Sequence, residues 1–483
     1  MAPKEILTVA EMSAADAAAI AAGTPGLVLM RRAGEAVAAE IIARFSPRAT
    51  AVLCGPGNNG GDGYVVARVL KAAGWDVWVE ALAAPATDDA KAAAAEWTGQ
   101  TTALAAQNRE AELFVDALFG AGLARPLTGE AARLARASER MPERFVAIDM
   151  PSGLAGDLAA PGGDAFRAAL TVTFHRRKIA HTLQPGRARC GDVVVADIGL
   201  EDSPAQLFEN SPDLFGPRMP WPDVNAHKHS RGRLIVVSGE AWSTGAARLA
   251  ARAGLRAGAG LVTLLSPPDS LRSNASHLEA VMLAPFDSEV ELEAAAANVD
   301  AAIIGPAAGI SEETLVNVLA LARTGAALVI DADALTVFRD DPSELFGALD
   351  RDDVLTPHPG EFERIFPGLL AKSPQRITAA REAARRASCV VVLKGPDTVI
   401  AAPDGRAAVS LNGSPWLATA GSGDVLAGLI GGLIAQGMES FEAACAAVWI
   451  HAEAAAGFGP GLTSEDLPGL TPSVLKRLHA ERA

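Results

Sequence analysis

The sequence predicts an α/β protein of two domains, each with a parallel sheet between layers of helices. Its 483 residues exceed what one hydrophobic core normally holds. In both halves, short apolar runs alternate with helical segments, and polar or glycine-rich loops follow those runs, as in βαβ units. Closely spaced proline dipeptides over residues 201–223 interrupt this rhythm. We therefore expect a first domain over residues 1–212, a linker over 213–224 and a second domain over 225–483.

The composition narrows the class of protein. Hydrophobic residues make up 49% and charged residues 20%, which is typical of a globular protein. The net charge of -15 and the lack of a basic stripe disfavour nucleic acid as a partner. No long apolar run is present and the N-terminus carries charges, so we expect neither a membrane segment nor a signal peptide. The four cysteines stand at neither metal-ligand nor redox spacing, which indicates a cytoplasmic protein.

The first half is expected to begin with helices over residues 8–45, where charged residues break an alanine-rich pattern at amphipathic spacing. A buried strand, a glycine-rich turn and a helix follow, and they start a βαβ unit over residues 51–73. The turn occupies 55–63 and the helix begins at 64. The further elements expected are a helix over 90–98 and strands over 75–82, 113–118, 145–148, 170–174 and 193–198.

Polar residues at the ends of these strands form the first candidate site. The loop over residues 58–63 offers backbone amides to a phosphate and side-chain oxygens to a cation. Asn59, Asp116 and Ser152 could converge as oxygen ligands of a hard monovalent cation. In the alternative interpretation, Asp116 and Asp149 are helix caps or loop residues without a catalytic role.

The second half repeats the alternation of strands and helices. A helix is expected over residues 245–257 and another over 425–435, after the turn residues of 412–415. The strands are expected over 234–239, 261–265, 301–305, 328–330, 354–356 and 390–393.

The second candidate site is the segment Gly421-Ser422-Gly423-Asp424, at the entrance of the last of these helices. Two glycines let successive backbone amides face one concave surface, and the helix dipole makes that surface an anion site. Asp424 in the first turn is held ionised and can accept a proton from a hydroxyl group. A phosphate cradle beside a base can transfer a phosphoryl group to an alcohol. The alternative is that Asp424 only complements the helix terminus.

Residues 1–210 resemble the NAD(P)H-hydrate epimerase domain, which implies a Rossmann-like fold. The matching motifs are Asn58-Asn59-Gly60-Gly61-Asp62-Gly63, Asp116-Ala117-Leu118-Phe119-Gly120, Asp149-Met150-Pro151-Ser152-Gly153, and Thr171-Val172-Thr173-Phe174 followed by Lys178. The resemblance implies that Asn59, Asp116 and Ser152 hold potassium and that Asp149 is catalytic at the reacting ring. The substrate-binding residues that it implies are Asn58, Asn59, Gly60, Gly61, Asp62, Gly120, Ala121, Gly122, Leu123, Ala124, Arg125, Pro126 and Asp149. Two departures, Arg31 for an acidic residue and Ala169 for an aspartate, lie outside this set.

Residues 225–460 resemble the ADP-dependent NAD(P)H-hydrate dehydratase, which is a member of the ribokinase-like superfamily. The matching motifs include Asp331-Ala332-Asp333-Ala334-Leu335, Thr356-Pro357-His358-Pro359-Gly360-Glu361-Phe362, Leu393-Lys394-Gly395 and the 421–424 segment. One departure is Ala307, where the family has a glycine; its methyl group is expected to crowd the substrate or to force a different turn.

The second resemblance also implies roles for single residues. Asp424 is the catalytic base that deprotonates the substrate hydroxyl, and Glu361 acts on magnesium through water. Substrate binding is implied for Ala246, Gly309, His358 and Asp424, although a lone loop histidine more often has no such role. ADP binding is implied for Lys394, Gly395, Pro396, Asp397, Thr398, Gly421, Ser422 and Gly423, with Mg²⁺ on the phosphates.

Together these resemblances predict a bifunctional enzyme of nicotinamide-nucleotide repair. The first domain interconverts the R and S hydrates of NADH or NADPH, and the second dehydrates the S form at the expense of ADP, releasing AMP and phosphate. A homo-oligomer with small-molecule partners only is expected. The alternatives are a ribokinase-like kinase of a vitamin-like alcohol, and a first domain that binds a ligand without catalysis.

Overall fold

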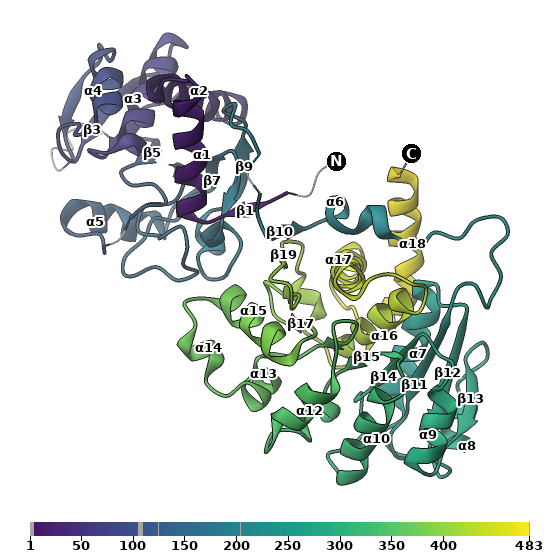
Figure 1. Ribbon diagram of the computed structural model, residues 1–483. Coiled ribbons are helices and arrows are strands. Elements are labelled where there is room, and N and C mark those ends of the chain that lie inside the picture. Colours follow the sequence, from purple (N-terminus) through teal and green to yellow (C-terminus); the bar gives the residue numbers. More distant parts are fainter. Residues whose placement is uncertain (1–3, 105–109, 124, 203, 483) are drawn as a thin grey trace. The chain divides into compact units, whose positions relative to one another are not determined.

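The computed structural model describes residues 4–104, 110–123, 125–202 and 204–482 (Figure 1). Its contacts divide the chain into an N-terminal unit, Glu5–Ala205, and a C-terminal unit that comprises Gln206–Ala483 together with Lys4. The predicted boundary at residue 212 is therefore too late. Strand β10 (Leu207–Asn210) pairs in parallel with strand β19 of the C-terminal sheet, which draws the segment after Ala205 into that unit.

The N-terminal unit is built on a sheet of seven parallel strands in the order β4-β3-β2-β5-β6-β7-β9. The strand predictions are confirmed, and only the short β4 was not foreseen. The bounds are β2 Thr50–Cys54, β3 Val77–Ala81, β4 Thr101–Ala103, β5 Leu113–Ala117, β6 Phe145–Ile148, β7 Leu170–Phe174 and β9 Asp192–Ala196. A separate two-stranded pair joins β1 (Ile6–Leu7) to β8 (Arg177–Lys178).

Helices cover both faces of this sheet, and they form a separate apolar cluster with each face. One cluster includes Val37 and Leu70 from the helices that cover one face, and the other includes Leu134. The unit is therefore a three-layer α/β/α sandwich, as expected. The helices are α1 Val9–Ala21, α2 Gly26–Arg44, α3 Asn58–Ala72, α4 Asp88–Ala95 and α5 Gly129–Ser138.

We predicted a turn over the glycine-rich residues 55–63. In the structure, residues 58–63 instead form the start of helix α3. The helix begins at Asn58, six residues before the predicted start. Its first turn lies against the backbone of the strand ends: a β-carbon added to Gly60 would lie 1.9 Å from the Gly55 carbonyl oxygen, and one added to Gly55 would lie 1.8 Å from that of Leu118. The glycines therefore serve close backbone packing at a helix N-terminus.

The C-terminal unit is built on a ten-stranded sheet in the order β10-β19-β18-β17-β16-β15-β14-β11-β12-β13. The strands are parallel except β18, which runs antiparallel to both of its neighbours. The six predicted strands are present, and β10, β13, β18 and β19 were not predicted. The bounds are β11 Arg233–Val237, β12 Leu261–Ser266, β13 Met282–Pro285, β14 Ala301–Ile304, β15 Ala327–Ile330, β16 Val354–Leu355, β17 Val390–Leu393, β18 Val399–Ala401 and β19 Ala407–Ser410.

Helices surround this second sheet (Figure 1). The proline-rich stretch predicted as a linker contains α6, the short 3-10 turn Gly216–Arg218 and buried Phe215, so it packs within the unit. The helices are α6 Pro212–Phe215, α7 Gly245–Ala257, α8 Leu271–Ala275, α9 Glu289–Ala296, α10 Glu312–Ala322, α11 Asp333–Thr336, α12 Pro342–Ala348, α13 Pro359–Ile365, α14 Leu369–Lys372, α15 Arg376–Ala387, α16 Ser422–Ile434, α17 Ser440–Phe458 and α18 Leu467–Glu481.

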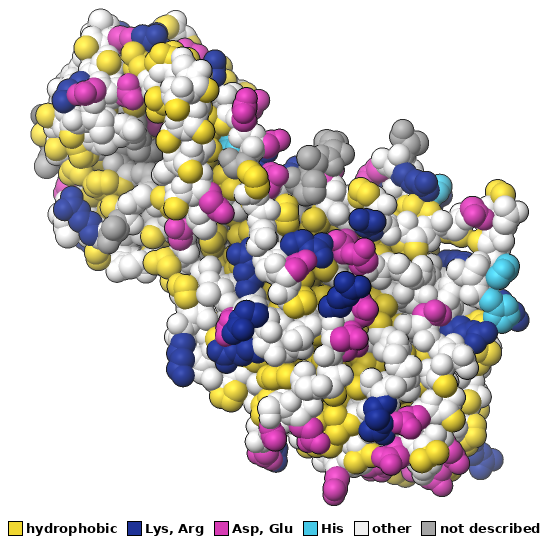
Figure 2. Space-filling view, in the orientation of Figure 1, with side chains coloured by type: hydrophobic (Ala, Val, Ile, Leu, Met, Phe, Trp, Pro, Cys, Tyr) yellow, Lys and Arg dark blue, Asp and Glu magenta, His cyan; other side chains and the backbone are white. Residues whose placement is uncertain are grey.

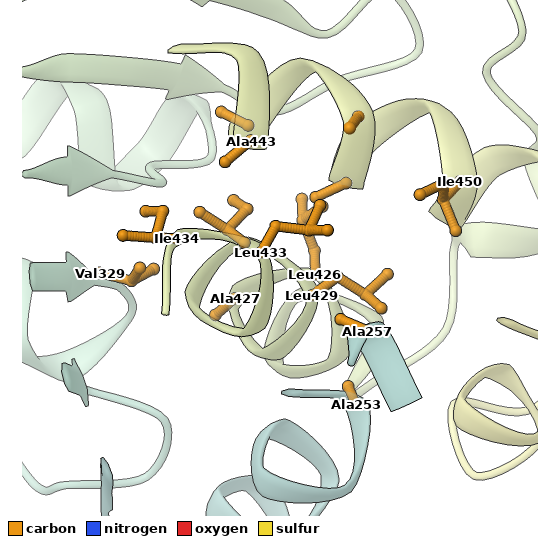
Figure 3. Close-up of a cluster of buried hydrophobic side chains, with 14 of the residues drawn as sticks. Ala253, Ala257, Val329, Leu426, Ala427, Leu429, Leu433, Ile434, Ala443 and Ile450 are labelled. Atoms are coloured by element: carbon orange, nitrogen blue, oxygen red, sulfur yellow. The ribbon is translucent and has the colours of Figure 1, made fainter. Parts of the chain in front are cut away.

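Helix α16 lies at the centre of the apolar core of this unit. Its leucines and Ile434 face side chains of α7, α17 and strand β15 (Figure 3). Small residues bring α7 and α16 into backbone contact: a β-carbon added to Gly428 would lie 2.2 Å from the Ala250 carbonyl oxygen, and one added to Gly432 would lie 2.6 Å from that of Gly254. This packing fixes the position of the α16 N-terminus and of Asp424, one turn before Gly428.

The surface carries charges of both signs. On the face shown in Figure 2, Lys and Arg side chains are interspersed with Asp and Glu side chains. Among the described residues, no helix is both long enough and apolar enough to cross a membrane.

Candidate active sites

The N-terminal unit contains a cavity of about 730 Å³ at the carboxyl ends of its parallel strands. Helices α1 and α2 and the N-terminus of α3 contribute to its walls, together with the loop after β5. Its charged lining residues are Asp16, Asp62, Asp89, Arg125, Asp149 and Lys178. Ligands bind at this edge of parallel sheets, and the volume suits a nucleotide-sized molecule.

Asp149, which follows β6, is fixed by three donors. Its carboxylate accepts hydrogen bonds from Lys178 Nζ at 2.7 Å, Thr173 Oγ1 at 2.9 Å and the Ala121 backbone amide at 3.0 Å. Its φ of +62° is strained for a residue with a side chain. Burial alone would raise the pKa of Asp149, but Lys178 outweighs burial and lowers it to about 2. Asp149 is therefore a permanently ionised group and a weak proton acceptor.

His181 holds the backbone of Asp149 and is itself held by the backbone of Lys178. Lys178 is 1% exposed, and its backbone amide donates to His181 Nδ1 at 2.9 Å. Because Nδ1 is the acceptor, the neutral ring carries its proton on Nε2, which donates to the Asp149 carbonyl oxygen at 2.9 Å. Burial lowers the pKa of His181 to about 3, so the ring stays neutral.

Two further carboxyl groups in the cavity behave in the opposite way. Burial raises the pKa of Asp62 well above its ordinary value, and the nearby Asp149 and Asp16 raise it further. Burial also raises the pKa of Asp16, against the opposing effect of Lys178. The cavity thus combines a carboxylate that stays ionised with carboxyl groups that hold protons readily.

Asp116 and Ser152 meet beneath the cavity, as predicted for a cation site. Asp116 Oδ2 accepts from the Ser152 amide at 2.7 Å. Ser152 Oγ lies 2.7 Å from Asp116 Oδ1 and 3.0 Å from the Phe119 carbonyl oxygen, although it has only one proton to donate. The buried Asn59 Nδ2 has no hydrogen-bond partner among the described residues. Burial raises the pKa of Asp116 to about 6. Ser152 Oγ also accepts from the Phe119 amide at 2.9 Å, so this hydroxyl and the Asp116 carboxylate form one buried polar cluster.

The predicted epimerase-site residues divide into those that line the cavity and those that do not. Gly60 and Gly61 pack instead against Gly55 and Met30, Pro126 is not in the lining, and Ala124 lies outside the described residues. Those in the lining are Asn58, Asn59, Asp62, Gly120, Ala121, Gly122, Leu123, Arg125 and Asp149. No role was predicted for four residues that hold or adjoin Asp149, namely Asp16, Thr173, Lys178 and His181.

The second site lies at the carboxyl ends of β15, β16 and β17, which are neighbours in the C-terminal sheet. Lys394, after β17, pairs with Asp331, after β15, at 2.7 Å and lies 3.8 Å from Glu361. Burial lowers the pKa of Lys394, but Asp331 and Glu361 outweigh burial and raise it. A β-carbon added to Gly423 would lie 3.4 Å from Lys394 Nζ, so the α16 N-terminus adjoins this ion pair.

Asp424 lies in the first turn of α16, as predicted. The preceding Gly421 has a φ of +86°, a conformation that favours glycine. Burial raises the pKa of Asp424 to about 6, and Asp331 contributes to the rise. A carboxylate with this pKa is mostly ionised at neutral pH yet accepts a proton more readily than an ordinary aspartate.

Side chains of Arg376 and of the loop itself stabilise the predicted nucleotide loop, residues 394–398. Arg376 of α15 donates to the Lys394 carbonyl oxygen at 2.7 Å and pairs with Asp397 at 3.3 Å. Thr398 Oγ1 lies 2.8 Å from the Gly395 carbonyl oxygen and 3.1 Å from its amide. Since Asp397 is 1% exposed and faces Arg376, its side chain supports the loop instead of facing a nucleotide. Ser422 Oγ similarly donates to the Leu417 carbonyl oxygen at 2.8 Å.

The predicted substrate residues of this unit lie at loop and helix ends. Ala246 is in the first turn of α7, and the Gly309 amide donates to Asp333 at 3.0 Å. His358 caps α13: its Nδ1 accepts from the Gly360 amide at 2.9 Å, and its Nε2 lies 3.2 Å from Glu361. Both ring nitrogens are thus engaged, which is the structural role weighed as the alternative to substrate binding for this histidine.

The turn around Ala307 keeps a left-handed conformation despite the methyl group. Its φ is +54°, between Gly305 at +124° and Gly309 at +86°. An alanine at such a φ costs roughly 1 kcal/mol relative to glycine. The Ala307 carbonyl oxygen also occupies the position next to Gly239, where an added β-carbon would lie 1.8 Å away.

Comparison with protein families gives two matches that follow the two units. Residues 26–180 match the family described as YjeF-related protein N-terminus, and residues 234–465 match the family described as NAD(P)H-hydrate dehydratase. A ribokinase-like superfamily protein from Enterococcus faecalis superposes with a TM-score of 0.51 at 23% identity, over 58% of this chain and 99% of that one. The C-terminal unit therefore has the ribokinase-like fold that was predicted.

Full-length relatives are also found. The chain is 36% identical to the bifunctional NAD(P)H-hydrate repair enzyme Nnr of Thermofilum pendens, over 94% of this chain and 93% of that protein. It is 35% identical to the enzyme of the same name from Moorella thermoacetica, over 99% and 97% of the two chains. The corresponding enzyme of Escherichia coli is 33% identical, over 94% and 91%.

Proposed function

The chain belongs to the family of bifunctional NAD(P)H-hydrate repair enzymes, and we propose from this premise which groups carry each of its two reactions. The N-terminal unit epimerises the R and S hydrates in the 730 Å³ cavity, and the C-terminal unit dehydrates the S hydrate at the β15–β17 strand ends. The observation that carries the assignment is the presence of two separately built sites in one chain. A kinase of a vitamin-like alcohol would use the second site alone.

The first site binds the hydrate through the α3 N-terminus and the loop after β5. Backbone amides at the start of α3 attract the phosphates of the coenzyme. Asp149 faces the nicotinamide ring and is oriented by Lys178 and Thr173.

Potassium is proposed beside this site, where side-chain or carbonyl oxygens of Asp116, Ser152 and Phe119 lie close together. The residues fit the ion, because the Asp116 carboxylate and the Phe119 carbonyl oxygen both lie within hydrogen-bond distance of the Ser152 hydroxyl, whose single proton can satisfy only one of them. Rotating the Asn59 amide by 180° would replace its unpaired Nδ2 with an oxygen ligand. The ion would supply positive charge that holds the loop after β5 in place.

The second site combines a base with an anion cradle. Asp424 accepts the proton of the substrate hydroxyl as that oxygen attacks the terminal phosphorus of ADP, and AMP leaves. The Gly421–Gly423 amides and Lys394 stabilise the charge on the transferred phosphoryl group. Phosphate is a far better leaving group than hydroxide, so its elimination restores the ring double bond.

Magnesium is expected to enter with the nucleotide. Among the described residues, no group of three His, Cys, Asp or Glu side chains is arranged to hold a metal. Mg²⁺ commonly binds through substrate phosphates, one or two carboxylates and water, and Asp331 and Glu361 flank Lys394 in a position to serve. The bound ion would neutralise phosphate charge.

The test is to incubate the protein with mixed hydrates and either ADP or ATP, and to follow the absorbance of the regenerated reduced coenzyme. Complete conversion is expected with ADP, in a fast phase followed by a phase limited by epimerisation. Conversion that stops at the S fraction would remove the epimerase assignment, and no conversion with either nucleotide would remove the dehydratase assignment.

The proposal also covers the cellular compartment and the oligomeric state. The four buried free thiols fit a protein of the reducing cytoplasm. A homo-oligomer is proposed as well, and light scattering of the purified chain would test it.

A further inference from the structure

The N-terminal cavity contains one carboxyl group, that of Asp62, whose presence substrate binding alone does not explain. Asp16, Asp62 and Asp149 all line the cavity. Asp149 is saturated by three donors, whereas no hydrogen bond or ion pair joins the Asp62 side chain to another described residue. Asp62 is only 9% exposed. A nearly buried carboxyl group without a partner is costly unless it carries a proton or serves a ligand.

We propose that Asp62 is the acid that protonates the departing hydroxyl group during epimerisation, while Asp149 remains ionised and stabilises the cation that forms. The inference rests on the proposed function of the N-terminal unit and adds the reaction route. It gives Asp149, for which the resemblance implied a catalytic role at the reacting ring, an electrostatic role, and it assigns proton transfer to Asp62.

The route follows from the chemistry of the hydrate, whose hydroxyl-bearing stereocentre is bonded to the ring nitrogen. Asp62 gives its proton to the hydroxyl oxygen, and the carbon–oxygen bond breaks with its electron pair, releasing water. The nitrogen lone pair forms a carbon–nitrogen double bond, which leaves a positively charged ring. Water then adds to the opposite face, the double-bond pair returns to nitrogen, and the surplus proton returns to the Asp62 carboxylate.

The charges of the cavity favour this route over ring opening. Breaking the carbon–nitrogen bond instead would give an aldehyde and place negative charge on nitrogen and the carboxamide. Of the two described cationic residues that line the cavity, Lys178 is already paired with Asp149 at 2.7 Å and Arg125 is exposed. Once Asp62 has given up its proton, its carboxylate stabilises a positively charged ring and opposes negative charge on the nitrogen.

The protonation states agree with these roles. Burial raises the pKa of Asp62 well above its ordinary value, with contributions from Asp149 and Asp16, so it holds a proton where Asp149 does not. Pairs of carboxyl groups with separated pKa values commonly divide acid and electrostatic roles. Cys54 also interacts electrostatically with Asp62, and the remaining charged residues that line the cavity are Asp89, Arg125 and Lys178.

The first experiment compares Asp62→Asn with the parent full-length chain on the pure R hydrate, reading the S isomer by chiral chromatography. The variant should lose at least about 100-fold in epimerisation rate, while its dehydration of the S hydrate stays at the parent level. Glu80→Gln neutralises a buried carboxylate of β3 outside the cavity and should epimerise normally. A parent chain that leaves the R isomer untouched refutes the proposed function; an active parent with an equally active Asp62→Asn variant refutes the inference.

The second experiment needs no variant and reads the route directly. Epimerisation in H₂¹⁸O should place one solvent oxygen in the product per turnover, after subtraction of the uncatalysed exchange. Retention of the original oxygen would establish ring opening and overturn the proposal.

The pH profile separates an acid from a structural residue. The parent rate should fall as pH rises through the raised pKa of Asp62. Asp16→Asn removes a neighbouring charge, so the falling limb should move to lower pH. A limb that stays in place in this variant would count against Asp62 as the acid.

Discussion

Replacing Gly428 by alanine should disable dehydration through packing alone. The added β-carbon would lie 2.2 Å from the Ala250 carbonyl oxygen and 2.7 Å from the Ala253 side chain, against 3.4 Å for ordinary contact. Backbone cannot rotate away as a side chain can, so α16 must move from α7 by about 1 Å. Overpacking of this kind costs about 1–3 kcal/mol of unfolding free energy.

The same displacement of α16 would also move Asp424, because Asp424 lies one helical turn before Gly428. A misplacement of about 1 Å at a reacting group can lower the rate roughly 100-fold. Dehydration of the S hydrate by Gly428→Ala should fall by that order, with an earlier urea transition for the C-terminal unit. Epimerisation should be unchanged, since the N-terminal unit has its own sheet and core.

Gly457→Ala is the matched control. Gly457 lies in α17, which also packs on α16, but an added β-carbon there would meet nothing within 4 Å. Alanine should therefore stabilise the helix by up to about 1 kcal/mol and leave both activities intact. Parent-like stability and dehydration in Gly428→Ala would show that the α7–α16 contact does not position Asp424.

Three further predictions concern the two sites. Asp424→Asn should lower dehydration about 1000-fold, or about 4 kcal/mol, with epimerisation retained; equal rates in initial-velocity assays would exclude Asp424 as the base. Because the ionised carboxylate is the base and its pKa is raised to about 6, the parent dehydration rate should fall as pH drops through about 6, and a flat pH profile down to 5 would contradict this. Asp116→Ala should reduce epimerisation and abolish its dependence on added potassium, with dehydration of the pure S hydrate intact; unchanged potassium activation would place the ion elsewhere.

The core strands could be predicted because their residues are apolar and β-branched. Segments such as Phe145–Ile148 and Val390–Leu393 are buried along their whole length, as parallel strands are. Strands β18 and β19 escaped prediction because Val399–Ala401 and Ala407–Ser410 are short, and alanine occupies two positions of the second. The start of α3 was misjudged because glycines indicate a turn unless the backbone that approaches them is known.

Candidate site residues could be proposed from the sequence where they stand at a strand end or a helix start. Asp149, after β6, and Asp424, in the first turn of α16, were proposed in this way. Lys178 reaches Asp149 across 29 residues, and Arg376 reaches the loop after β17 from a different helix, so only tertiary structure reveals them. The raised pKa of Asp62 likewise depends on burial beside Asp149 and Asp16, which no local pattern encodes.

Strand β10 bears on how this protein can be divided for separate study. It forms one edge of the C-terminal sheet, and the Glu209 amide donates to the Lys4 carbonyl oxygen at 2.8 Å. A fragment that ends at residue 212 would contain β10, so the complementary fragment would lack it. The backbone groups of β19 would then be unpaired, which promotes aggregation. Cutting after Ala205 leaves both sheets whole. With fragments 5–205 and 206–483, poor solubility would therefore come from the unit itself and not from a sheet edge exposed by the cut.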